Sequence, residues 1–275
     1  MIRKLLIFAA ICGGVYWMLD AFARQALYPA PAVPVPSPPP APMEEVRLSL
    51  ATGEETVAWA YTPADLAPTA PVVLFFHGNG ENLQTMSWAG LYQDLGQLGI
   101  AFLAADYPGY GLSSGRPSEE GLLATGDAAV AWARERHPGR PVILCGWSLG
   151  AALSLATAAR LPGEVQGVAV LSPWTSLADV ARHHFPPFLV SALLREKYDS
   201  LAAARQVKVP ALVIHGEVDD LIPAEQGRRV AEALAGPAAP ADTVRWVPVP
   251  GAGHNDLLAQ PVVWEELARF FSRFG

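Results

Sequence analysis

The chain has 275 residues, of which 51% are hydrophobic and 16% are charged. So apolar a composition can bury enough surface to offset the entropy of folding, which excludes disorder over the whole length and suits a single domain with a sizeable core. The net charge of -7, from 19 basic and 26 acidic residues, argues against a nucleic-acid binder and favours a neutral or apolar partner.

The chain opens with an uncharged run at residues 5–19, preceded by Arg3 and Lys4. This layout is typical of a secretory signal or an uncleaved membrane anchor. As a helix the run rises only about 22 Å, against a hydrocarbon core of about 30 Å. We interpret residues 1–28 as a signal peptide or an N-terminal transmembrane anchor, with the anchor favoured and a helix buried in the domain as the third reading. The catalytic domain is then membrane-anchored on the periplasmic or extracellular side, or secreted after cleavage.

A proline-rich segment follows at residues 29–43. Its first fourteen positions read PAPAVPVPSPPPAP and include eight prolines. Proline at this density forms neither a helix nor a central strand, so the segment is predicted to be an extended polyproline linker of about 43 Å at most. We expect it to hold the next domain away from the membrane.

From residue 44 to 275, short apolar runs alternate with longer amphipathic stretches. This rhythm predicts an α/β domain with a mostly parallel sheet. The first two strands have no helix between them and are expected to pair antiparallel at one edge. Strands are predicted at residues 45–49, 56–61, 72–76, 100–104, 142–145, 168–171, 211–214 and 244–249. Helices are predicted at residues 82–98, 119–136, 149–161, 224–234 and 256–271.

Two stretches match the pattern G-x-S-x-G, GWSLG at residues 146–150 and GLSSG at residues 111–115. A nucleophile elbow needs a buried strand that runs straight into a helix, so that the serine lies on a sharp turn with its oxygen exposed. Only the first match has this context. The second lies between Pro-Gly and Arg-Pro pairs, which are typical of a loop. We therefore assign Ser148 as a nucleophile and Ser113 as a loop hydroxyl.

A serine nucleophile needs a base that is oriented by an acid. His254 lies in a turn of small residues after the last strand, where its imidazole can reach another loop, so it is the preferred base. His215, at the end of an earlier strand, suits a packed structural role. The acid is expected after strand 211–214, where Asp219 and Asp220 are neighbours and Glu217 is a third candidate.

The transition state of acyl transfer also needs two hydrogen-bond donors for the developing oxyanion. The turn HGNG at residues 77–80 follows the strand predicted at residues 72–76. We expect the backbone N–H groups of Asn79 and Leu149 to form the oxyanion hole. The side chains of His77 and Asn79 are expected only to hold the loop.

Six strings along the chain, HGNGEN, DYPGYGLSSG, GWSLG, SPWTS, HGEVDDLIP and GAGHND, occur in the order and spacing of the α/β-hydrolase family. The resemblance covers about residues 45 to 274 and is greatest to the membrane-associated serine hydrolases with a short lid. It implies an eight-stranded, mostly parallel sheet flanked by helices, with a short cap excursion. It also implies a triad of Ser148, Asp219 and His254, because Asp219 begins the family pattern D-x-x-[IV]-P. The long proline-rich segment departs from the family.

Between residues 172 and 207 the chain leaves the sheet for an excursion that is too short for a separate cap domain. We expect four aromatic residues to wall an apolar acyl slot, although simple packing of the excursion onto the sheet explains them equally well. These residues are Trp147, Trp174, Phe185 and Phe188.

The function predicted from these features is a serine hydrolase that cleaves carboxylic esters, esterase-like or lipase-like, through an acyl-serine intermediate. The substrate would be a small-molecule or lipid-like acyl ester. A thioesterase (deacylase) or a peptidase on the same fold is the alternative, because acyl-serine chemistry does not fix the leaving group. A non-catalytic binding module is the least favoured reading. The two cysteines, Cys12 and Cys145, occupy unrelated settings, and no metal, organic cofactor or nucleic acid is expected.

Overall fold

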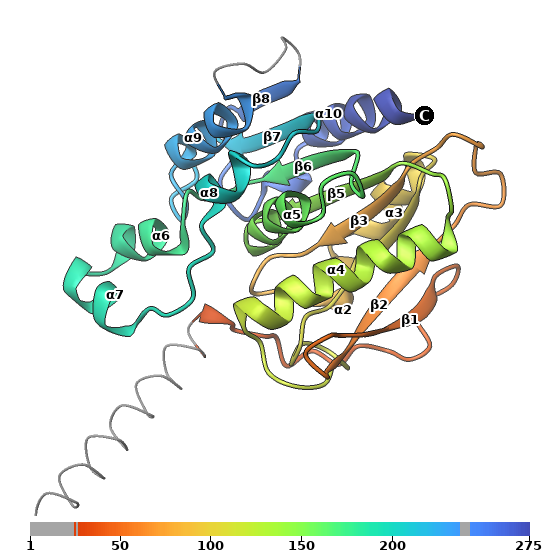
Figure 1. Cartoon of the computed structure of the whole chain (residues 1–275), viewed down its shortest axis with the longest axis horizontal. Coiled ribbons are helices and arrows are strands. Elements are labelled where there is room, and N and C mark those ends of the chain that lie inside the picture. Colours follow the sequence, from red (N-terminus) through yellow and green to blue (C-terminus); the bar gives the residue numbers. More distant parts are fainter. Residues whose placement is uncertain (1–24, 26, 237–242) are drawn as a thin grey trace, which may run out of the picture.

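A computed structural model describes residue 25, residues 27–236 and residues 243–275, and its framework is an eight-stranded sheet (Figure 1). The strand order is β1-β2-β4-β3-β5-β6-β7-β8. Strands β3 to β8 are mutually parallel, whereas β2 pairs antiparallel with both β1 and β4. The strands are β1 (Glu44–Ser49), β2 (Glu55–Tyr61), β3 (Val72–Phe76), β4 (Ala101–Ala105), β5 (Val142–Trp147), β6 (Gly167–Leu171), β7 (Ala211–Gly216) and β8 (Val244–Val249).

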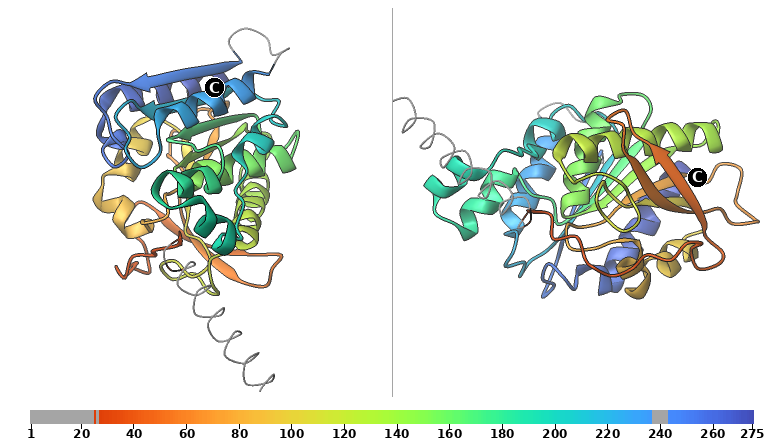
Figure 2. Two further views of the ribbon diagram at one scale, coloured as in Figure 1. Left: turned by 90° about the vertical axis from the view of Figure 1, so that its left-hand side faces the viewer. Right: turned by 90° about the horizontal axis from the view of Figure 1, so that it is seen from below.

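Helices cover both faces of this sheet. On one face the core is completed by α4 (Glu119–Arg136), α5 (Leu149–Arg160), α8 (Ser200–Ala204) and α9 (Ala224–Ala235). On the other it is completed by α2 (Leu83–Trp88), α3 (Leu91–Gln97) and α10 (Pro261–Phe271). The left view of Figure 2 shows α4 on one side of the sheet and α2, α3 and α10 on the other. Central strands therefore need apolar residues on both sides, which explains the unbroken apolar run of β3.

All eight predicted strands are present, and the predicted α/β-hydrolase architecture is confirmed. Two predicted helices differ in detail. The helix expected at residues 82–98 is broken into α2 and α3 at Gly90, whose φ of 82° lies in the left-handed region. The helix expected at residues 256–271 begins as a 3-10 turn (Leu257–Ala259), and α10 starts only at Pro261, because proline suits the first turn of a helix.

The excursion between β6 and β7 contains helices that the sequence analysis left unassigned. They are α6 (Leu177–His184), α7 (Pro187–Leu193) and α8. Figure 1 shows α6 and α7 projecting from one end of the sheet. This end also carries the carboxyl ends of the parallel strands, where ligands of α/β folds bind.

The proline-rich segment, together with Tyr28 just before it, packs on the domain over part of its length. Tyr28 and Val35 are buried, and the Tyr28 hydroxyl lies 2.7 Å from that of Tyr198. The Asn82 amide donates to the carbonyl of Val33 at 2.9 Å. These contacts were not foreseen from the sequence, which predicted an extended linker. The physical reason is that the residues between the prolines add apolar surface, while the carbonyls of an extended segment remain free to accept hydrogen bonds.

The expected location on a membrane is corrected by the structure. Within residues 25, 27–236 and 243–275, no helix combines the length and the hydropathy needed to cross a bilayer. The uncharged run at residues 5–19, on which the anchor or signal predicted at residues 1–28 depends, lies outside the residues that the structure describes. The described residues therefore do not support the predicted membrane anchoring of the domain.

Candidate active site

Ser148 lies on the sharp turn between β5 and α5. Its φ of 57° and ψ of -113° are unusual for a residue other than glycine, so the turn is strained. The glycines on either side allow a close approach of the backbone. A Cβ added at Gly146 would overlap the carbonyl of Gly150, and a Cβ added at Gly150 would overlap the carbonyl of Phe76. The local geometry is therefore that of a nucleophile elbow.

Three predicted residues form one buried chain of hydrogen-bonded groups. The Ser148 hydroxyl lies 3.1 Å from Nε2 of His254, and Nδ1 of His254 lies 2.8 Å from Oδ2 of Asp219. Each of the three residues is at most 6% exposed. They are supplied by the loops after β5, β7 and β8, whose carboxyl ends lie at the same edge of the sheet. An imidazole so placed can take a proton from the hydroxyl while the carboxylate fixes its tautomer.

The backbone and a second imidazole hold the Asp219 carboxylate. Its Oδ1 accepts from the N–H groups of Leu221 at 3.0 Å and Ile222 at 2.7 Å. Nε2 of His215 lies 3.2 Å from its Oδ2. Burial raises the pKa of this carboxyl, but the hydrogen bonds from His215, His254 and the backbone outweigh it and hold the pKa well below its usual range. The other acids weighed from the sequence, Asp220 and Glu217, are exposed.

The competing serine motif lies in the loop between β4 and α4. The hydroxyl of Ser113 accepts from the N–H of Val57 at 2.9 Å, and that of Ser114 accepts from the N–H of Glu55 at 2.8 Å. Both bonds fix the loop to strand β2. The G-x-S-x-G pattern at residues 111–115 is therefore part of a structural turn.

The loop expected to carry one oxyanion donor packs against the start of α5. Leu149 is the first residue of α5, so its N–H has no partner within the helix. The carbonyl of Asn79 accepts from the Tyr110 hydroxyl at 2.9 Å, and its side-chain amide donates to the carbonyl of Leu27 at 3.2 Å. The Asn79 side chain thus holds the loop, as expected.

Comparison with known proteins identifies the family. The family model for the alpha/beta hydrolase fold matches residues 71–194. The uncharacterized protein Rv2307c of Mycobacterium tuberculosis is 35% identical over 272 residues, which cover 97% of this chain and 93% of that protein. Human alpha/beta hydrolase domain-containing protein 17B is 35% identical over 204 residues, 73% of this chain and 66% of that protein. The chain belongs to the α/β-hydrolase family.

Solved structures with the same fold include esterases. An esterase of Pyrococcus furiosus superposes with a TM-score of 0.72 and 17% identity, covering 89% of this chain and 97% of that one. Est1E of Butyrivibrio proteoclasticus, whose structure holds ferulic acid, superposes with a TM-score of 0.67 and 19% identity, covering 83% and 98%. At such low identity these likenesses describe the fold alone.

Sequence reasoning overlooked a group of residues in this α/β hydrolase that support the loop after β3. The Asp106 carboxylate contacts the His77 ring, and the Tyr107 hydroxyl donates to the carbonyl of His77 at 2.6 Å. Together with Tyr110 they come from the string DYPGYG, which follows β4 directly. Because β3 and β4 are parallel neighbours, the loops after them meet. Knowing that β4 lies beside β3 would have placed the string DYPGYG next to the string HGNGEN.

The four aromatic residues expected to form an acyl slot lie in different settings. The Trp147 ring is buried and stacks on His254 with ring centroids 5.6 Å apart. Trp174 is buried and donates through Nε1 to the carbonyl of Tyr198 at 3.3 Å. Phe185 and Phe188 are 60% and 71% exposed. The structure thus brings Trp147 beside the imidazole, gives Trp174 a packing role, and leaves the two phenylalanines on the surface of the excursion.

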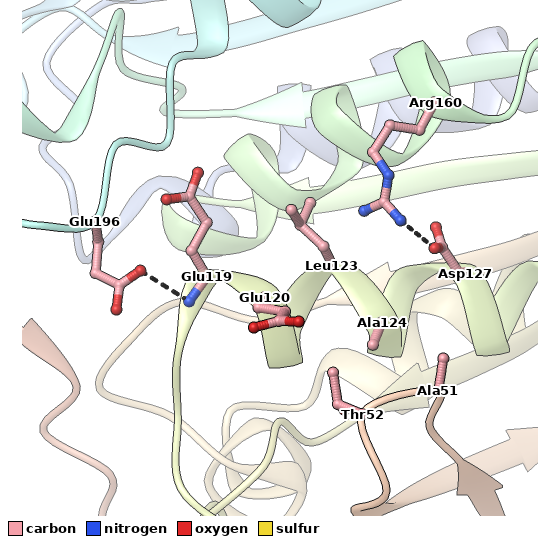
Figure 3. A pocket seen from close by; sticks show the side chains of 9 residues that line it. All are labelled: Ala51, Thr52, Glu119, Glu120, Leu123, Ala124, Asp127, Arg160 and Glu196. Atoms are coloured by element: carbon pink, nitrogen blue, oxygen red, sulfur yellow. Dashed lines mark hydrogen bonds and ion pairs between the residues drawn. The ribbon is translucent and has the colours of Figure 1, made fainter.

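A cavity of about 500 Å³ lies away from Ser148, between α4, α5 and the turn after β1 (Figure 3). Three of its acidic residues have structural partners: Asp127 pairs with Arg160, and Glu119 and Glu196 form hydrogen bonds. The Glu196 carboxylate accepts from the N–H of Glu119 at 3.0 Å, at the start of α4, where the helix dipole favours an anion. The Glu119 carboxylate accepts from the N–H groups of Lys197 and Tyr198. These hydrogen bonds join the start of α4 to the excursion. Among the described residues, no group of three or more His, Cys, Asp or Glu could hold a metal ion.

Proposed function

We propose that this α/β hydrolase cleaves carboxylic esters, of small or lipid-like acyl substrates, through an acyl-serine intermediate. In this proposal Ser148 is the nucleophile, His254 the general base and Asp219 the acid that orients it. The observation that carries the proposal is the buried chain of contacts from the Ser148 hydroxyl through His254 to Asp219, with distances of 3.1 and 2.8 Å. Both distances are within hydrogen-bond reach, so His254 can take the proton of Ser148 while Asp219 orients its ring.

Acylation begins when the Ser148 oxygen attacks the ester carbonyl and its proton passes to Nε2 of His254. Negative charge then develops on the former carbonyl oxygen. The backbone N–H groups of Asn79 and Leu149 are proposed to stabilise this oxyanion by donating hydrogen bonds to it. When the tetrahedral intermediate collapses, His254 returns the proton to the leaving alkoxide. The alcohol departs, and the acyl group stays on Ser148.

Deacylation repeats these steps with water. His254 takes a proton from the water as it attacks the acyl carbon, and returns it to the Ser148 oxygen as the carboxylic acid leaves. Asp219 stays ionised throughout, because the donors around it hold its pKa well below its usual range. The charged carboxylate stabilises the imidazolium that forms in each half-reaction.

The acyl group is proposed to lie against Trp147, whose ring stacks on His254. Phe185 and Phe188 would extend this apolar surface only if a substrate reaches the excursion. Activity on nitrophenyl esters of increasing chain length measures that reach. Under this proposal kcat/KM rises beyond acetate, and Phe188→Ser lowers the value for the longer esters alone. A flat or falling series would contradict the apolar slot while leaving the serine chemistry intact.

The test of the proposed chemistry uses the second serine motif as an internal control. A fluorophosphonate probe labels activated serines, so wild-type protein and Ser113→Ala should be labelled and hydrolyse nitrophenyl butyrate, whereas Ser148→Ala should do neither. Both substitutions remove one hydroxyl from a G-x-S-x-G sequence. Labelling that persists in Ser148→Ala would refute the assignment of the nucleophile.

A further inference from the structure

A second imidazole and carboxylate pair lies beneath the loop after β3, and the chemistry proposed above does not use it. Nε2 of His77 lies 3.1 Å from Oδ1 of Asp106. The same Oδ1 accepts from the N–H of Leu83 at 3.0 Å. His77 is 2% exposed and Asp106 is fully buried. Oδ2 of Asp106 has no hydrogen-bond partner among the described residues and faces the Cα of Gly111, where an added Cβ would overlap it.

The partners of His77 fix its protons. Nδ1 of its ring lies 2.7 Å from the carbonyl oxygen of Gly78. A carbonyl oxygen only accepts hydrogen bonds, so Nδ1 must carry a hydrogen. The contact between Nε2 and Oδ1 needs a second proton, on the nitrogen or on the oxygen. The buried pair is therefore either an imidazolium beside a carboxylate or a neutral imidazole beside a carboxylic acid. In both forms the pair has no net charge.

The carbonyl that His77 holds belongs to the peptide unit that ends in the N–H of Asn79. This N–H is the donor proposed for the oxyanion. A peptide whose oxygen accepts a hydrogen bond becomes a stronger donor at its nitrogen, because bonds in a chain polarise one another. We propose that His77, itself oriented by Asp106, is a positioning residue that fixes and polarises the Gly78–Asn79 peptide for the oxyanion.

This inference rests on the proposed serine hydrolase function and names a part of its machinery. The loop has other hydrogen bonds, which act on other peptide units. The Tyr107 hydroxyl donates to the carbonyl of His77, and the Tyr110 hydroxyl donates to the carbonyl of Asn79. Neither carbonyl shares a peptide unit with the N–H of Asn79. Replacing either tyrosine by phenylalanine is therefore a matched control, since each substitution removes one hydrogen bond from the same loop.

The experiment compares three variants of the full chain in the hydrolysis of nitrophenyl butyrate and in inhibition by a trifluoromethyl ketone. The ketone forms a tetrahedral adduct with an oxyanion, so its Ki reports the oxyanion site directly. His77→Leu removes both contacts of the ring and should lower kcat roughly 10²-fold, with KM nearly unchanged and Ki raised in parallel. His77→Asn keeps an amide nitrogen at the place of Nδ1 and should recover most of the loss. Tyr107→Phe should keep kcat within about threefold while lowering the melting temperature.

The outcomes separate this inference from the function beneath it. A wild-type enzyme that neither reacts with fluorophosphonate nor hydrolyses the ester would overturn both. An active wild type with an equally active His77→Leu would overturn the positioning role alone. Equal losses in His77→Asn, His77→Leu and Tyr107→Phe, in step with their melting temperatures, would reduce His77 to a structural residue and also contradict the proposal. If His77→Leu does not fold, His77→Gln takes its place, because its amide reaches the place of Nε2 and leaves the carbonyl of Gly78 without a donor. A Ki of His77→Gln equal to that of His77→Asn would then overturn the proposal.

Discussion

Two imidazole and carboxylate pairs, His254 with Asp219 and His77 with Asp106, have the same components and differ in the group that contacts the other nitrogen of the ring. In one pair, His254 places its second ring nitrogen 3.1 Å from the hydroxyl of Ser148. In the other, His77 places its second nitrogen 2.7 Å from the carbonyl of Gly78. A hydroxyl can donate or accept, so the nitrogen of His254 can gain or lose a proton and still keep its partner. A carbonyl only accepts, which keeps the proton on His77. The first pair can move a proton, and the second holds one in place.

The carboxyl groups of the two pairs differ in the number of their hydrogen-bond donors and in the direction of their pKa shifts. Asp219 accepts from two backbone N–H groups and contacts two imidazoles. These donors more than offset the effect of burial, and its pKa lies well below the usual range. Asp106 accepts from one backbone N–H and one imidazole, and burial raises its pKa despite them. The carboxyl that we propose stays charged during the reaction is thus surrounded by donors, whereas the one that shares a proton has fewer.

The largest expected contrast comes from replacing each carboxylate by its amide. Asp219→Asn should lower kcat roughly 10⁴-fold, because the amide favours the wrong imidazole tautomer and cannot stabilise an imidazolium. The overall geometry should survive, as an amide has nearly the same shape. Steady-state kinetics on nitrophenyl butyrate, with circular dichroism to verify the fold, measures the effect. An Asp219→Asn enzyme within tenfold of wild type would remove Asp219 from the proposed triad.

The matching substitution in the second pair should act mainly on stability. Asp106→Asn should lower kcat only about tenfold, because the peptide that His77 holds is loosened while the triad is intact. It should lower the free energy of unfolding by about 1–3 kcal/mol, since a buried hydrogen-bond network is disturbed. Urea unfolding and kinetics on the same preparation give both values. A loss of kcat as large as that of Asp219→Asn would show that the two pairs do not differ as described.

A smaller effect is expected from the third buried imidazole. Nε2 of His215 must carry a hydrogen, because it lies 2.8 Å from the carbonyl of Ile222, and this N–H also faces Asp219. Its Nδ1 has no hydrogen-bond partner among the described residues, and a Cβ added at Gly227 would overlap it. His215→Leu should lower kcat roughly fivefold, which corresponds to about 1 kcal/mol. His215→Gln, which keeps a donor at similar reach, should be closer to wild type. The reverse ranking would show that ring packing, and not the hydrogen bond, is what matters.

The first of these pairs could be predicted from the sequence, and the second could not. Ser148, Asp219 and His254 were predicted because each follows its own apolar run, and the ends of parallel strands meet at one edge. The contact between His77 and Asp106 depends on β4 lying beside β3, and this order comes from the assembled sheet. His77 was therefore expected only to hold its loop.

The same limit applied to the fold. Strands β3 and β8 were predicted with the bounds that the structure has, because a strand covered on both faces or bounded by turns gives a clear local pattern. Helix α7 was not predicted. The two prolines at its start, Pro186 at the N-cap and Pro187 as its first residue, are typical of a loop, yet proline also suits the first turn of a helix. Which outcome applies depends on how the excursion packs, which no local pattern encodes.

The smallest predicted effect is a difference in sign between the two carboxyls on acidification. Asp219 has a lowered pKa in the folded state, so its stabilisation is present above the unfolded value of about 3.9 and is lost as the pH falls further. Asp106 has a raised pKa, so its stabilisation is full below about 3.9 and is lost as the pH rises through the folded value. Between pH 6 and pH 3, the difference in unfolding free energy between wild type and Asp219→Asn should therefore shrink. The difference between wild type and Asp106→Asn should grow. Urea unfolding of the three proteins at unit steps of pH measures both trends. Parallel trends would mean that the two carboxyls carry the same charge in the folded protein. That result would contradict the distinction between a pair that moves a proton and a pair that holds one in place.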